Sequence, residues 1–388
     1  MRLGELGWVL ALAGLPWSYF LIRLITPFKD LDIWHANTWW MQGWILVLAG
    51  VHAMNKKALG VLPASLWWLV IWSTLLNLWM LNAQSKAGQP YALPLLPALG
   101  NLWMVVLALL VMSAWDASFL KTLAIAIFWS GVGLVCYGWL QVVNLDQFFR
   151  AATMVGTPDL SVTKDYLVGM MGNPTHFACQ MALWIPFALC QPRYARLWII
   201  PALGLVWMAS SSTALAMSAF LLVSWVWQHS RRMGVLTAVG LSSLGTGLFW
   251  WKGTFWLNPF GRWETWSAWW PIIQRHPILG HGLGFVKNLT QQLPPTHPLF
   301  GWKHLHNEYY QVWVELGIIG LLLVGWAAWQ LWQRRHHGTR SSLRWAYGSS
   351  FLACALMGLL NFTFHLWQLG GWGLMGLAGW LVLTEKVI

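Results

Sequence analysis

Two segments combine histidines, arginines and acids at spacings suited to catalysis. The first, residues 303–317, reads KHLHNEYYQVWVELG and leads into an apolar run. Positions 304, 308, 311 and 315 are polar with 4-3-4 spacing, so a helix containing all four carries them on one face. His306 lies at the outer end of this stripe, where an imidazole can take a proton from a hydroxyl. A structural histidine at a helix start is the alternative.

A weaker alternative for this segment is a zinc site formed by His297, His304 and His306. The spacing of these histidines matches no standard set of zinc ligands. We therefore expect proton transfer rather than metal chemistry.

The second segment, residues 258–271, reads NPFGRWETWSAWWP. Trp263, Trp266 and Trp270 share one face at helical spacing, which predicts a short helix lying on the membrane surface with its rings down. Arg262 begins this helix, and its planar guanidinium matches the oxygens of a phosphate group. The alternative partners of Arg262 are lipid headgroups and Glu264.

Residues 272–284, IIQRHPILGHGLG, connect these two segments. The glycines and Pro277 predict a tightly turned loop. Arg275, His276 and His281 are candidates for binding an anionic group, although solvated loop side chains have the same composition. The glycine pattern at 280–284 follows no strand, so we interpret it as a turn rather than a dinucleotide site.

The composition of the chain indicates that these segments belong to an integral membrane protein. Of the 388 residues, 58% are hydrophobic and only 9% are charged, whereas soluble domains have about 25% charged residues. This excludes a soluble enzyme, a disordered chain and a nucleic-acid-binding domain, despite the net charge of +12. We predict an all-α fold in which residues 1–388 form a single integral membrane domain.

Apolar runs near the length needed to cross a bilayer, about 20 residues, predict a bundle of about twelve transmembrane helices. The expected helices span residues 8–25, 38–54, 61–81, 93–115, 119–141, 170–190, 197–209, 213–228, 233–251, 308–332, 343–361 and 365–384.

Short basic loops follow the even-numbered helices, which predicts that these loops and both termini are cytoplasmic. Residues 252–307 then form a long outward-facing loop that contains short interfacial helices. Because long loops on a compact scaffold often carry function, we expect this loop to be catalytic.

Taken in order, the motifs resemble the O-antigen ligase and polymerase superfamily of bacterial envelope glycosyltransferases. The segments that carry the resemblance are GNPTH at 172–176, GRW at 261–263 with Trp266, HPILG at 276–280 with Gly282 and Gly284, HNEY at 306–309, and ELG at 315–317 with Gly320.

The resemblance implies a GT-C-like transfer that needs no metal or other cofactor. The donor would be a glycan on undecaprenyl pyrophosphate, and the acceptor a lipid A-core or other glycan hydroxyl. The enzyme would lie among the lipids of the bacterial inner (cytoplasmic) membrane, with a periplasmic active site and no nucleic-acid partner.

The resemblance also implies roles for single residues. Arg262 matches the family's loop arginine that holds the pyrophosphate, and His306 matches the histidine that activates the acceptor. The further substrate-binding candidates are Arg275, His276, His281, Asn173, His304, Asn307, Glu308 and Tyr310. Many ligases carry a Ser-Arg motif near the eighth helix, but residues 210–214 here read SSSTA. A second cation would have to come from Arg275 or Lys252.

Three alternatives to a ligase remain at this stage. A polymerase extends lipid-linked repeat units, and a protein O-oligosaccharyltransferase glycosylates serine or threonine. A lipid or solute transporter belongs to a different class, in which functional groups lie near the bilayer midplane. The candidate residues here gather on the outward side rather than near the midplane, which favours transfer chemistry.

Overall fold

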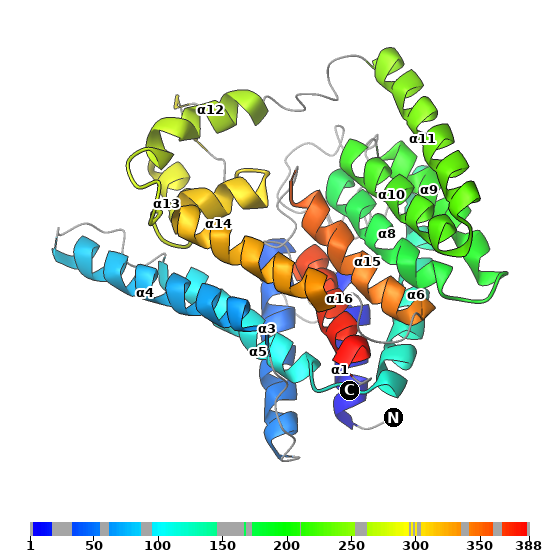
Figure 1. The fold of residues 1–388 in the computed structure, drawn as a ribbon, viewed down its shortest axis with the longest axis horizontal. Helices are drawn as coiled ribbons and strands as arrows, with labels where there is room; N and C mark the ends of the chain where they lie inside the picture. Colours follow the sequence, from blue (N-terminus) through cyan, green and yellow to red (C-terminus); the bar gives the residue numbers. More distant parts are fainter. Residues whose placement is uncertain are drawn as a thin grey trace.

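The computed structural model describes residues 3–17, 33–54, 62–86, 95–145, 167, 173–209, 211–252, 262–294, 296–297, 299–300, 304–334, 341–359 and 367–385. Every regular element in these ranges is helical (Figure 1). The elements are α1 (Leu3–Ala13), η1 (Leu15–Trp17), α3 (Ile33–Met54), α4 (Ala64–Lys86), α5 (Leu95–Met112), α6 (Ala117–Val142), α8 (Pro174–Leu189), η4 (Ala195–Trp198), α9 (Ile199–Met208), α10 (Ser212–His229), α11 (Arg231–Lys252), α12 (Arg262–Ile273), α13 (Phe285–Gln292), α14 (Glu308–Arg334), α15 (Ser342–Met357) and α16 (Trp367–Glu385).

A helix lies at each of the twelve segments expected to be apolar spans, and the all-α prediction is confirmed for the described residues. Three helical stretches are long and apolar enough to cross a membrane: Ala64–Asn82, Ala117–Val142 and Glu308–Arg334. The other expected spans are shorter or less apolar in their described parts. The count of twelve crossings therefore stays a prediction.

The first expected helix, 8–25, is wrong in its extent. Helix α1 ends at Ala13, and a 3-10 turn follows at Leu15–Trp17. Pro16 lacks the N–H needed to continue the helical hydrogen bonds, which explains the early end. Residues 18–25 lie outside the described part of the chain.

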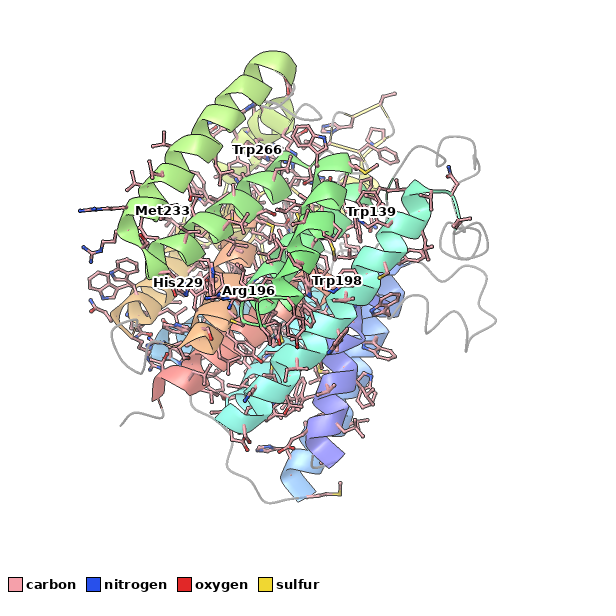
Figure 2. The ribbon with its side chains drawn as sticks, turned by 90° about the vertical axis from the view of Figure 1, so that its right-hand side faces the viewer. Trp139, Arg196, Trp198, His229, Met233 and Trp266 are labelled. Carbon is pink, nitrogen blue, oxygen red and sulfur yellow. The ribbon has the colours of Figure 1, made fainter. Side chains whose placement is uncertain are left out.

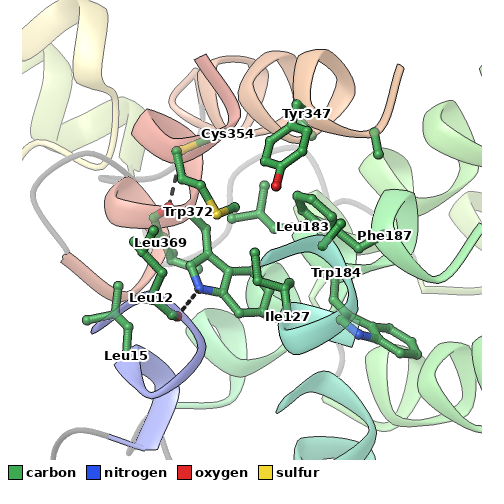
Figure 3. Packing of buried hydrophobic residues seen from close by; sticks show 14 of the residues in the cluster. Leu12, Leu15, Ile127, Leu183, Trp184, Phe187, Tyr347, Cys354, Leu369 and Trp372 are labelled. Atoms are coloured by element: carbon green, nitrogen blue, oxygen red, sulfur yellow. Dashed lines mark hydrogen bonds between the residues drawn. The ribbon is translucent and has the colours of Figure 1, made fainter. Parts of the chain in front are cut away.

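The main core surrounds helix α8, whose residues from His176 to Leu189 are all buried. Large aromatic side chains of α8 and of neighbouring helices fill the space between them (Figure 3). Their polar tips find backbone acceptors: Trp372 Nε1 donates to Leu12 O at 2.8 Å and Trp184 Nε1 to Phe128 O at 3.0 Å. An apolar interior makes such pairing necessary.

Helices α8 and α10 run parallel, with α15 antiparallel to both. Three contacts place the C-terminal ends of α8 and α10 beside the start of α15. Cys190 Sγ contacts Ser342 O at 2.7 Å, the Arg196 guanidinium lies 5.3 Å from the Trp225 ring, and the Trp225 and Trp345 rings are 4.8 Å apart. Figure 2 shows this region, with Arg196 and His229 labelled.

A second, smaller core holds α12, α13 and the segment before α14 against α14. Its buried side chains are Trp269, Ile273, Val286, Leu299, Leu305 and Val314. Figure 1 shows α12 and α13 gathered near the N-terminal half of α14, away from the α8–α10 bundle.

Two glycines join this loop to α14. Gly317 interrupts the helix with φ 69° and ψ −170°, and Gly280 has φ 80°. A Cβ added to Gly280 would lie 2.5 Å from Glu315 O, so no side chain fits there. The close approach lets the Gly282 amide donate to Glu315 O at 2.8 Å, which fixes the loop to the helix.

Candidate functional site

His306 lies in the turn immediately before α14, with a left-handed φ of 53° that is uncommon for a non-glycine residue. Its imidazole is half-buried. The peptide before it is held on both sides: Leu305 N donates to Gln311 Oε1 at 3.3 Å, and Leu305 O accepts from Trp266 Nε1 at 2.7 Å. The surrounding helices thus determine where the imidazole lies.

Arg262 is the first residue of α12 and is only 8% exposed. It shares the inner face of the helix with Thr265 and Trp269, which are also buried. One turn further along, Trp266 makes the bond to Leu305 O described above, and Tyr310 O–H donates to Trp266 O at 2.9 Å. These two hydrogen bonds attach the arginine helix to the chain around His306.

The charge of Arg262 acts on His306. Burial, together with the nearby guanidinium, lowers the pKa of His306 from 6.5 to about 4. Burial also lowers the pKa of Arg262, but a guanidinium starts so far above 7 that it stays charged. The resting site therefore combines a neutral imidazole with a buried cation.

The start of α8 lies near both residues of this site. His176 is 6% exposed and interacts electrostatically with His306, while Cys179, one turn along, interacts with Arg262. The sequence motif at 172–176 contains His176, yet sequence reasoning assigned it no role. Its position directly after an Asn-Pro helix start was the available signal.

Several substrate-binding candidates have structural roles at helix starts. Asn173 caps α8, accepting from the amides of Thr175 at 2.9 Å and His176 at 3.3 Å. Asn307 accepts from Tyr310 N at 2.9 Å in the same way before α14. Both side chains stabilise the helix ends that carry the site, and substrate contact by them remains a prediction.

Glu308 is buried where α14 meets α15. Its amide donates to Gly358 O at 2.7 Å, and a Cβ on Gly358 would come within 3.1 Å of its Cγ. Tyr309 O–H donates to Ala355 O at 2.9 Å and strengthens the same junction. The start of α14 is therefore fixed to the bundle as well as to the loop.

The expected polar stripe is confirmed for its helical part. Glu308, Gln311 and Glu315 are all buried along one side of α14. His304 precedes the helix and is half-buried, so it does not belong to the stripe.

The expected tryptophan face of α12 needs a correction. Trp263 and Trp270 are exposed, but Trp266 is partly buried because its indole N–H bonds Leu305 O. The indole donor is thus used inside the protein, and only two of the three rings can face lipid.

Arg275, His276 and His281 form a separate cluster beyond the other end of α12. The eleven-residue advance from Arg262 to Ile273 corresponds to about 17 Å along a helix. The rings of His276 and His281 lie 4.8 Å apart, and His281 Nε2 is 3.0 Å from Ile272 O. Burial lowers the pKa of His281. Arg275 is thus too far along the helix to be the second cation beside Arg262.

Ser211, in the run of serines before α10, caps this helix by accepting from Ala214 N at 3.4 Å. The serine run therefore acts as a helix start. Across the described residues, no group of three histidine, cysteine or acidic side chains is arranged to hold a metal ion.

Part of the chain matches the model of a known protein family. Residues 197–325 match the family model described as O-antigen ligase. This segment contains Arg262, His306, α12, α13 and the first part of α14, and it confirms the resemblance to the O-antigen ligase and polymerase superfamily. No curated protein matches the chain.

Proposed function

We propose that this relative of the O-antigen ligases transfers a glycan from undecaprenyl pyrophosphate to a hydroxyl of a lipid A-core or similar acceptor. The observation that carries the proposal is the pairing of a buried guanidinium with a half-buried, neutral imidazole: Arg262 contributes to a pKa of about 4 for His306. The guanidinium can bind the oxygens of a diphosphate, and the neutral imidazole can accept the proton of a hydroxyl.

In the proposed reaction His306 accepts the proton of the acceptor hydroxyl. The hydroxyl oxygen bonds to the anomeric carbon as the bond from that carbon to the diphosphate oxygen breaks. The bonding electrons leave with the diphosphate, and Arg262 stabilises the charge that develops there. Donor binding places negative charge beside the site, which raises the pKa of His306 and makes it a stronger base.

The arrangement of charges supports a site on the periplasmic face. Arg196, Arg231 and Arg344 lie near the end of the bundle where α8 and α10 finish and α15 begins. His176 and Glu308 mark the opposite end of the same helices. By the positive-inside rule, the basic end is cytoplasmic. In this proposal the chain crosses the inner membrane about twelve times with both termini in the cytoplasm.

The same site serves a ligase or a polymerase, because the two differ in the acceptor rather than in the donor chemistry. The products that accumulate in cells without the protein distinguish a ligase, with its lipid A-core acceptor, from a polymerase. Accumulated full-length glycan on the lipid carrier in cells without the protein supports the ligase, and single repeat units on the core support the polymerase.

The direct test incubates purified protein in nanodiscs with an undecaprenyl-pyrophosphate glycan and candidate acceptors, without metal or nucleotide. We expect transfer by the wild type, and a loss of at least about 100-fold for His306→Ala and Arg262→Ala. Gln330→Ala is the matched control, because Gln330 lies on α14 far from the site, where it accepts from Ser65. Transfer at the normal rate by His306→Ala would refute the mechanism.

A further inference from the structure

Helix α13 begins without a cap of its own. Its N-cap is Gly284, which has no side chain to accept from the first amides. The carboxylate of Glu315, from α14, accepts from Val286 N at 3.3 Å instead. Glu315 is only 3% exposed, so the bond lies inside the protein. A negative charge at a helix N-terminus is favourable.

The same carboxylate is connected to the turn that holds His306. Gln311 lies one turn before Glu315 on α14, and its Nε2 donates to Glu315 Oε1 at 3.3 Å. The other end of that amide, Oε1, accepts from Leu305 N at 3.3 Å. A continuous line of hydrogen bonds therefore runs from α13 through two side chains to the residue before His306.

The line determines how Gln311 is oriented. An amide side chain can turn over, exchanging its oxygen and its NH₂ group. Glu315, as an acceptor, requires the NH₂ group on its side, which leaves the oxygen for Leu305 N. Without the carboxylate, this preference is lost, and so is the fixed acceptor for the Leu305 amide.

We propose that Glu315 is a positioning residue for transfer: through Gln311 it fixes the Leu305–His306 turn so that the imidazole stays beside Arg262. Glu315 lies nine residues from His306, and its carboxylate accepts from Val286 N and Gln311 Nε2, so it acts on the imidazole through other groups of the protein. The left-handed φ of 53° at His306 makes such support necessary, because a non-glycine residue keeps this conformation only when its surroundings require it. This inference rests on the proposed function.

The test compares Glu315→Ala, Gln311→Ala and the double variant with Gln330→Ala in the nanodisc assay. We expect each single variant to lower kcat about 10- to 100-fold with little change in KM for the donor, because a displaced base slows the chemical step. The double variant should be no worse than either single one, since both break the same line. Glu315→Gln keeps an oxygen acceptor and should retain most of the activity.

Amide hydrogen exchange gives a readout that does not depend on turnover. Peptides covering residues 304–310 should exchange faster in Glu315→Ala and in Gln311→Ala than in the wild type, and at the normal rate in Gln330→Ala. If Glu315→Ala does not fold, Gln311→Ala alone tests the loss of the hydrogen-bond line, with Glu315→Gln as the variant expected to keep it.

The outcomes separate the two proposals. Normal kcat in both alanine variants, or additive losses in the double variant, would overturn the positioning role while leaving the proposed function intact. Full activity in Arg262→Ala and His306→Ala would instead remove the proposed function, whatever Glu315 does. Faster exchange with an unchanged kcat would show that the turn moves without affecting transfer, and would also overturn the positioning role.

Discussion

Replacing Arg262 with glutamine should raise the pKa of His306. In the wild type the pKa of the imidazole is lowered from 6.5 to about 4. Burial is the larger cause and the charge of Arg262 the smaller one. Removing that charge can therefore recover only the smaller part of the shift, and we expect the pKa of His306 in Arg262→Gln to lie above about 4 but still below 6.5.

Histidine-selective NMR on the resting protein, without substrate, measures this change directly. The chain has 12 histidines, so a His306→Asn spectrum is needed to identify the resonance of His306. Arg275→Gln serves as the control, because Arg275 lies beyond the far end of α12 and acts on His281 instead. An unchanged pKa in Arg262→Gln, or a wild-type value near 6.5, would refute the electrostatic pairing.

The remaining predictions concern stability and local geometry. Asn173→Ala removes the cap of α8 and should cost about 1 kcal/mol of unfolding free energy, measured by chemical denaturation in detergent, whereas Asn173→Asp should cost less. Gly280→Ala places a Cβ against Glu315 O at a positive φ and should lower the melting temperature and the transfer rate together; an unaffected variant would contradict the close packing. Trp266→Phe removes the bond to Leu305 O and should lower kcat with little loss of melting temperature; equal losses would indicate a purely structural role.

Lowering the pH should also reduce the free energy of unfolding. The pKa of His306 is lower in the folded state than the usual 6.5, so between about pH 6.5 and 4 the unfolded chain binds the extra proton. Stability from this group is therefore complete above pH 6.5 and decreases as the pH falls toward 4. His306→Gln should show a flatter dependence in denaturation experiments across this range, and an identical slope would contradict the prediction.

The helices could be predicted from the sequence because length and continuity of apolar runs suffice to locate them. Helix α14 begins at Glu308, where its expected span begins, and α6 differs by two residues at its start and one at its end. The end of α1 was missed, although Pro16 was visible, because the apolar run continues past it.

The site was predictable in its chemistry but not in its arrangement. Arg262 and His306 were selected by residue type and resemblance, and the structure brings the Arg262 guanidinium close enough to contribute to the lowered pKa of His306. Arg275 was predicted as a possible second cation, but the length of α12 separates it from Arg262. His176 was overlooked because its proximity to His306 depends on how α8 packs, which no spacing along the chain reveals.

The interruption of α14 at Gly317 divides the helix into a first part that carries the buried polar residues and a second part that is mostly apolar. The inner part, from Ile318 to Arg334, has 17 residues and a length of about 26 Å, close to the hydrocarbon thickness of a bilayer. In the proposed orientation, the outer turns then stand at the depth of the lipid headgroups. A carrier lipid could present its diphosphate there while its isoprenoid chain remained dissolved among the acyl chains, so the enzyme would have no need to extract its substrate from the leaflet.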